Sequence, residues 1–129
     1  MKKLALAVIA LTLIFTSCSN ESKVKNTVEK FHESVLKADF ESAKKYSTKE
    51  SAEIFDYFIE NLKDEESKKL YLDALKDLKF KLKEIKIGAD KKTAEVIYEI
   101  QTIDGKTDEQ TYKLIKEGSS WLVDMKNSW

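Results

Sequence analysis

The sequence lacks several residue types, and each absence excludes a class of protein. The 129-residue chain has no proline, and all 23 of its basic residues are lysine, so arginine is missing as well. Without proline, no proline-rich linker divides the chain. Without arginine, there is no bidentate clamp for a phosphate or carboxylate group. The formal net charge is zero, which excludes the strongly basic surface of a typical nucleic-acid-binding protein.

The composition also argues against a disulfide bond and against a metal site. The chain contains one cysteine, Cys18, and one histidine, His32. A single cysteine cannot form an intramolecular disulfide. One histidine with scattered carboxylates does not give the ligand spacing of a metal site. We therefore expect neither a metal nor another cofactor.

Cys18 ends an N-terminal segment that resembles a bacterial lipoprotein signal. Two lysines near the start precede an apolar run of 12 residues from Leu4 to Phe15. A membrane-spanning helix needs about 20 residues, so this run has the length of a cleaved signal instead. Two small residues then precede the cysteine, as in a lipobox, although Phe15 stands where leucine is usual.

Cleavage before Cys18 would remove residues 1–17 as a signal peptide. The resemblance implies that this cysteine carries acyl chains such as palmitate, and that residues 18–22 form a short lipidated tether. Ser19 then favours the outer membrane if the host is Gram-negative. We therefore expect a protein anchored in the bacterial cell envelope through Cys18. The alternative is an incidental cysteine near an ordinary cleavage site.

Residues 23–126 have the length of one domain, and the apolar pattern of their first half is helical. Apolar residues at helical spacing predict a first helix over about 22–38. Asp39 is placed to cap a short second helix, and Ser47–Glu50 resembles a capping box that opens a third. Asp64–Ser67 interrupts the apolar pattern before a fourth helical stretch.

From about residue 80 the apolar pattern alternates, which predicts four strands. The alternation slips by one residue near Lys83–Glu84, and this indicates a bulge or a late helix end. Asp104–Gly105 between two alternating runs predicts a tight hairpin. The last strand begins at Trp121, and 127–129 form a tail. Helices followed by an antiparallel meander indicate the α+β class.

The order of these elements and several short motifs resemble nuclear transport factor 2-like domains. The motifs are Val28–His32, Lys37–Ala43, Tyr46–Ser47, Ala94–Val96, Asp104–Lys106 and Lys116–Asp124. The chain is similar to small bacterial lipoproteins that carry such a domain of unknown function. The resemblance implies N-terminal helices packed on a curved antiparallel sheet of about four strands, in a cone that often contains a cavity.

Some members of this superfamily, the ketosteroid isomerases and SnoaL-like cyclases, are enzymes. The isomerases have a tyrosine on the first helix where this chain has Phe31, which lacks the hydroxyl group. His32 could act as a general base, but no serine or cysteine nucleophile is paired with it. We therefore interpret His32 as a surface or boundary residue and assign no catalytic residue.

Aromatic residues are the candidates for the lining of a cavity, although at such positions they more often build a core. They are Phe31, Tyr46, Tyr57, Tyr98, Tyr112 and Trp121. The sequence thus predicts a lipid-anchored envelope protein with a non-enzymatic binding or interaction domain. The alternatives are an isomerase-like enzyme, a small-molecule-binding cone and a module that forms homodimers through its sheet. The expected partners are the membrane, a protein or second copy, and a small apolar ligand, but not nucleic acid.

Overall fold

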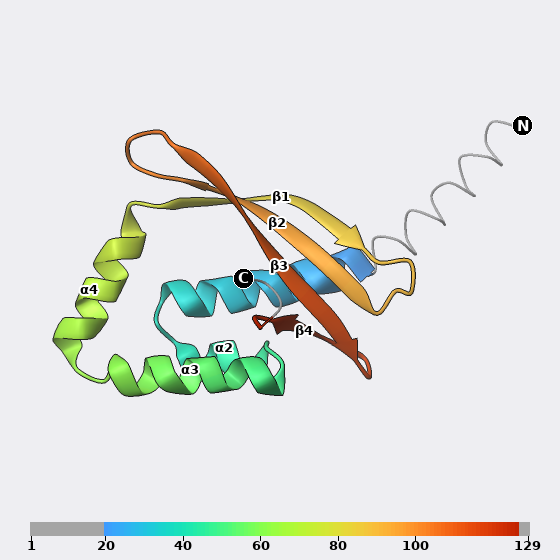
Figure 1. Ribbon diagram of the computed structural model, residues 1–129, viewed down its shortest axis with the longest axis horizontal. Coiled ribbons are helices and arrows are strands. Elements are labelled where there is room, and N and C mark those ends of the chain that lie inside the picture. The colour runs from blue at the N-terminus through green and yellow to red at the C-terminus, as the bar shows by residue number, and fades with distance from the viewer. Residues whose placement is uncertain (1–19, 127–129) are drawn as a thin grey trace, which may run out of the picture.

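The computed structural model describes residues 20–126, which form four helices and one antiparallel sheet (Figure 1). The signal peptide, Cys18 and the tail lie outside the described residues. The helices are a first helix over residues 20–36, α2 (Phe40–Lys45), α3 (Lys49–Asn61) and α4 (Glu65–Lys76). The strands are β1 (Lys79–Ile87), β2 (Thr93–Gln101), β3 (Thr107–Glu117) and β4 (Ser120–Asp124), and they neighbour one another in that order. The predicted α+β fold is confirmed.

The first helix covers residues 20–36 of the described part of the chain. It contains most of the predicted range of 22–38 and ends two residues before the predicted end, because the chain turns at Ala38.

A tight corner at Ala38 ends the first helix and starts α2. Ala38 has a φ angle of 58°, a left-handed conformation in which the helix cannot continue. Its N–H donates to the Val35 carbonyl at 3.1 Å, and the Asp39 N–H donates to the Ser34 carbonyl at 2.8 Å. This pair of bonds is a Schellman motif. The Asp39 carboxylate then accepts a bond from the Ser42 N–H, so its predicted capping role is confirmed.

α3 begins one residue later than the predicted capping box at Ser47–Glu50 implies. Thr48 is the N-cap, and its hydroxyl accepts a hydrogen bond from the Ser51 N–H at 3.2 Å. Ser47 instead forms a parallel bridge with Val123 of β4, which holds its backbone outside the helix. The interruption before the fourth helix is confirmed, because Asp64 is the N-cap of α4.

The sheet has one apolar face and one charged face. Along β2, Ala94, Val96 and Tyr98 are buried, whereas Glu95 between them is exposed. The register slips between Leu82 and Glu84, so the predicted bulge is confirmed. Because side chains alternate along a strand, this extra residue keeps the apolar side chains of both halves of β1 on one face.

The hairpin predicted at Asp104–Gly105 is confirmed, because β2 and β3 pair antiparallel on either side of it, and its loop is a three-residue turn. The Gly105 N–H donates to the Thr102 carbonyl at 3.0 Å, and the Thr102 N–H donates to the Lys106 carbonyl at 2.8 Å. Gly105 has a φ angle of 85°, while Asp104 does not enter the left-handed region. A tight type I′ turn needs positive φ at both central residues, so the loop widens instead.

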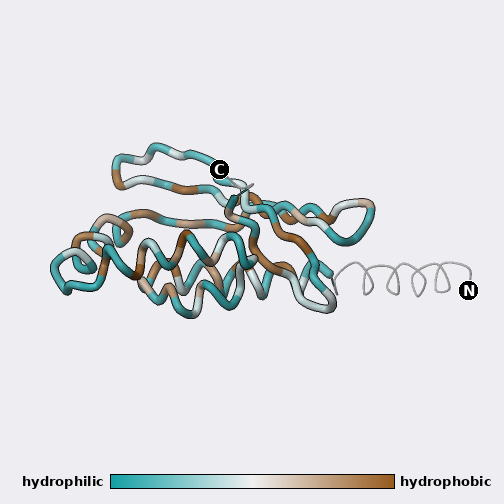
Figure 2. The backbone as a smooth tube through the Cα atoms, turned by 60° about the horizontal axis from the view of Figure 1, so that its bottom comes forward, coloured by the Kyte–Doolittle hydropathy of each residue, from teal (hydrophilic) through white to brown (hydrophobic). Residues whose placement is uncertain are grey.

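The core lies between the apolar face of the sheet and the helices, and the first helix runs along the sheet (Figure 1). Hydrophobic and hydrophilic residues alternate along the helices (Figure 2), so each helix can bury one side. α4 buries its apolar side least: Tyr71 and Leu72 pack against the core, but none of its residues is fully buried. Within residues 20–126, no helix has the length and apolar character needed to cross a membrane.

Candidate functional site

A groove of about 380 Å³ opens between the first helix and β1. Its floor is aromatic and aliphatic and consists of His32, Leu36, Phe80, Leu82 and Tyr98. Glu29, Glu33 and Lys37 from the first helix form its rim. An apolar surface with a few polar groups at its edge is the usual composition of a binding site.

His32 lies at the centre of this floor and contacts three aromatic rings. It stacks on Tyr98, with ring centroids 4.8 Å apart and an interplanar angle of 23°. It forms a T-shaped pair with Phe80, with ring centroids 4.5 Å apart, and the centroid of the Tyr112 ring lies 6.1 Å away. His32 is only 7% exposed, which corrects its interpretation as a surface or boundary residue. The periodicity placed it beside the apolar stripe, but only packing against the sheet shows that it is covered.

Both rings of the stack are neutral at pH 7, and burial moves the pKa of each ring further from 7. Burial lowers the pKa of His32 to about 4, because the charged imidazolium loses its solvation. It raises the pKa of Tyr98 to about 12, and the nearby charge of Glu29 acts in the same direction. A neutral imidazole has one donor and one acceptor nitrogen. The floor can therefore form hydrogen bonds with a ligand but has no net charge of its own.

The rim of the groove carries charges that are close to balanced. The Lys37 ammonium lies 2.6 Å from a carboxylate oxygen of Glu33, and Lys25 lies 3.8 Å from Glu29. The hydrogen bond from Lys37 lowers the pKa of the Glu33 carboxyl below its ordinary value. These pairs are exposed, so they contribute little to stability. They remain available to polar groups of a bound molecule.

A larger depression of about 480 Å³ lies at the other end of the sheet, near Gly88. Its charged lining consists of two lysines and two carboxylates, namely Lys86, Lys113, Glu95 and Asp124. Opposite charges in this arrangement offset one another, and the lining contains no aromatic ring. The smaller groove, with its aromatic floor and buried histidine, is therefore the stronger candidate.

The described residues offer no metal centre. Within residues 20–126, no group of three or more histidine, cysteine, aspartate or glutamate side chains could hold a metal ion.

The structure separates the six aromatic candidates into three environments. Tyr98 belongs to the core at 4% exposed and also lines the groove. Phe31, Tyr112 and Trp121 are at most 6% exposed and belong to the core. Tyr46 is half-buried beside a shallow depression, and Tyr57 is 67% exposed on α3. Sequence reasoning did not single out Leu36, Phe80 or Leu82, because aliphatic and aromatic residues on a strand or helix carry no signal that separates a groove from a core.

Helices packed along one face of an antiparallel sheet, with a groove beside the first helix, form a fold that is similar to that of nuclear transport factor 2-like domains. A solved structure with this fold is a putative NTF2-like transpeptidase from Campylobacter jejuni. The match has a TM-score of 0.51 at 16% sequence identity and covers 78% of this chain and 96% of that chain. At this identity, the likeness shows the fold and not the activity.

The chain belongs to the DUF4878 family, a domain of unknown function whose family model matches residues 16–124. No curated protein matches the chain.

Proposed function

We propose that this chain is a lipid-anchored binding domain of the bacterial cell envelope, and that its groove holds the apolar surface of a partner or ligand. The observation that carries the proposal is the partial exposure of the groove floor. Phe80 and Leu82 are only half-buried, although they lie on the apolar face of the sheet. Apolar surface that the domain itself leaves uncovered is available for binding.

The chemistry of the floor supports binding more than catalysis. A general acid or base works best when its pKa is near the working pH. The pKa of His32 lies far below neutrality and that of Tyr98 far above it, because both rings are buried. Phe31, at the position of the isomerase tyrosine, is 1% exposed and forms a T-shaped pair with Phe55. An isomerase-like reaction therefore has no oxyanion donor at this position.

The charge of the outer sheet face argues against a homodimer formed through that face. Lys81 stands opposite Glu99, and Lys86 stands opposite Glu95. A face of this kind is well solvated and offers little apolar area to a second copy.

Groove binding can be tested with a photo-crosslinking amino acid in intact envelopes. Leu36 on the groove floor is the test position, and Ile97 on the outer face of the sheet is the matched half-buried control. We expect a covalent adduct from Leu36 and none from Ile97. Equal labelling at both positions, or none at Leu36, would contradict the proposal.

The anchor is tested separately, because it rests on the signal-like N-terminus. Cys18→Ala should release the protein from the membrane pellet and remove the lipid from its mass. Ser19→Ala, which keeps the cysteine, is the control and should stay in the pellet. Lipid attached to the Cys18→Ala protein would rule out this anchor.

A further inference from the structure

The sheet has two edges, and the described residues cover one of them. At the β4 edge, the Val123 N–H donates to the Tyr46 carbonyl at 2.8 Å, and the Thr48 N–H donates to the Val123 carbonyl at 2.9 Å. At the other edge, β1 pairs with β2 alone. Within residues 20–126, the backbone of this nine-residue strand therefore has one side without a strand partner. Such an edge is a template for a further strand.

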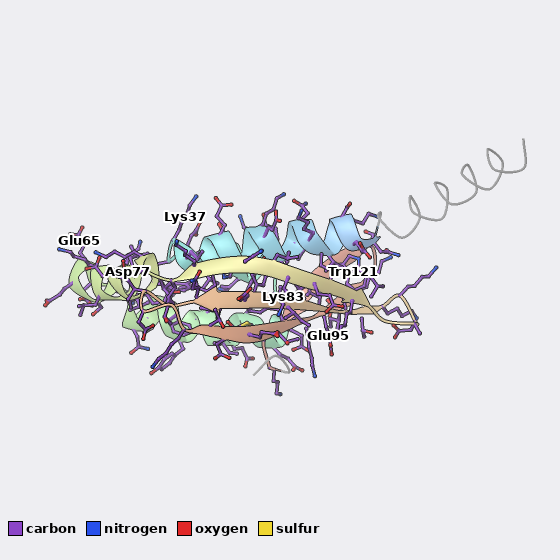
Figure 3. The ribbon with its side chains drawn as sticks, turned by 90° about the horizontal axis from the view of Figure 1, so that it is seen from above. Lys37, Glu65, Asp77, Lys83, Glu95 and Trp121 are labelled. Atoms are coloured by element: carbon purple, nitrogen blue, oxygen red, sulfur yellow. The ribbon has the colours of Figure 1, made fainter. Side chains whose placement is uncertain are left out.

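The open edge of β1 borders the groove. Phe80 and Leu82 of β1 form one wall, and Leu36 of the first helix stands on the other side. Seen from above in Figure 3, the first helix runs beside β1 along most of the strand. A strand added to β1 would direct every second side chain toward the groove, since side chains alternate along a strand. Apolar side chains at these positions would cover the exposed parts of the floor.

The other face of β1 is basic. Lysines occupy positions 79, 81, 83 and 86, and Glu84 beside the bulge is the one acidic residue. On the β2 side, two of these lysines stand opposite glutamates: Lys81 faces Glu99 and Lys86 faces Glu95. An added strand with acidic residues on this face would continue the same pattern. A second copy of β1 would place lysines against lysines, which is unfavourable.

We propose that β1 binds an extended acidic segment of a partner protein as a fifth strand of the sheet. The side chains of this segment alternate between apolar residues that enter the groove and acidic residues that face the lysines. Main-chain hydrogen bonds supply affinity in this mode of recognition, and alternate side chains supply specificity. The inference rests on the proposed binding role of the groove and names the class of its partner.

Synthetic peptides of about six residues, the usual length of a strand, provide the probe. The test peptide alternates glutamate and valine, and it is titrated against the full chain in detergent micelles by fluorescence anisotropy. One control has the same residues in two blocks, and another has lysine in place of glutamate. We expect saturable binding of the alternating acidic peptide alone. Equal binding of the block peptide would overturn the proposal.

Backbone methylation distinguishes strand addition from simple burial of apolar side chains. Two versions of the peptide carry N-methyl groups on alternate residues, in opposite phase. In an added strand, one set of N–H groups faces β1 and the other faces solvent. Exactly one version should therefore lose binding. Retained binding of both versions would exclude an added strand.

Charge reversal on β1 tests the role of the lysines. Lys81→Glu with Lys86→Glu should weaken binding of the acidic peptide by about tenfold and favour the lysine peptide, because two attractive cross-strand pairs become repulsive. Lys49→Glu with Lys69→Glu, at exposed positions on α3 and α4, is the matched control and should leave binding unchanged. If no peptide binds any of these proteins, the lysines only protect the edge from aggregation and the proposal is wrong.

The outcomes separate this inference from the proposed function. Crosslinking at Leu36 in envelopes without binding of the acidic peptide would keep the groove as a binding site and reject the fifth strand. No crosslinking at Leu36 and no peptide binding would reject both. A dimer of the wild-type chain in sedimentation velocity, with Leu36 crosslinked to a second copy of the chain, would identify that copy as the occupant and overturn the inference.

Discussion

His32 occupies a position where burial, and not a charged neighbour, sets its chemistry. The ring lies between the first helix and the sheet, stacked on Tyr98. Loss of solvation lowers its pKa from 6.5 to about 4. The unfolded chain therefore binds a proton between these pH values, while the folded chain does not.

This difference predicts a loss of stability in mild acid. The stabilisation by neutral His32 is fully present above about pH 6.5 and decreases as the pH falls toward 4. Lowering the pH from 7 to 5 should therefore lower the free energy of unfolding by about 2 kcal/mol. His32→Phe keeps a ring in the stack but cannot take up a proton, so its urea unfolding should be less sensitive to pH. Identical pH dependence in both proteins would show that His32 is solvated when folded.

The burial of Trp121 leads to a second prediction for a single residue. Trp121 is 3% exposed, and its indole N–H has no hydrogen-bond partner within residues 20–126. Trp121→Ala should lower the free energy of unfolding by about 3–5 kcal/mol, because it opens a large cavity. Trp121→Phe should cost much less, since it keeps a ring and removes a buried N–H without a partner. Urea denaturation measures both, and a loss below about 1 kcal/mol for the alanine variant would place Trp121 at the surface.

At the scale of elements, a buried polar contact joins the start of α3 to the end of β4. The Ser51 hydroxyl accepts a hydrogen bond from the Met125 N–H at 2.8 Å and lies 2.7 Å from the Thr48 hydroxyl. Ser51 is completely buried, so its hydroxyl has no water to replace these partners. This contact connects residues 74 positions apart in the chain.

Ser51→Ala should therefore destabilise the fold although alanine is the better helix former. The variant leaves the Met125 N–H without its acceptor, at a cost of about 1–3 kcal/mol for a buried group. Ser119→Ala, at an exposed turn position, should change the free energy of unfolding by less than about 0.5 kcal/mol. Thermal or urea unfolding compares the two, and equal stability of both variants would show that water satisfies the Met125 N–H.

At the scale of the whole molecule, stability is unevenly distributed. β2 and β3 each pair on both sides within the sheet, whereas α4 has no buried residue. One defined attachment of α4 is the Tyr71 hydroxyl, which donates to the Val35 carbonyl at 2.7 Å. Regions with few buried contacts open at low free energy.

Hydrogen exchange should follow this distribution. Amides of α4 are expected to exchange much faster than those of β2 and β3, because local opening of α4 exposes little apolar surface. Tyr71→Phe should accelerate exchange in α4 further while leaving β2 unchanged. Mass spectrometry of the exchanging chain measures both effects. Protection of α4 equal to that of β2 would mean that α4 unfolds only with the whole domain.

Local features of the sequence determined the class, the order of the elements and several boundaries. The change from helical spacing to alternation, the cap at Asp39 and the slip near Lys83–Glu84 each depend on neighbouring residues alone, so they were predictable. The predicted N-cap of α3 was wrong by one residue, because Ser47 pairs with Val123, which lies far away in the chain. The hairpin at Asp104–Gly105 was predictable as well, but its loop length was not, because a dipeptide alone does not set that length.

Only the tertiary structure decided what the groove contains. His32 and Tyr98 lie far apart in the sequence, and nothing in their local patterns places one ring on the other. Likewise, the spacing of Leu36 and Phe80 predicts that both are apolar contacts, but not that the domain leaves them partly uncovered. Burial and the pKa shifts that follow from it depend on which elements meet, because solvation is lost only where another part of the chain excludes water.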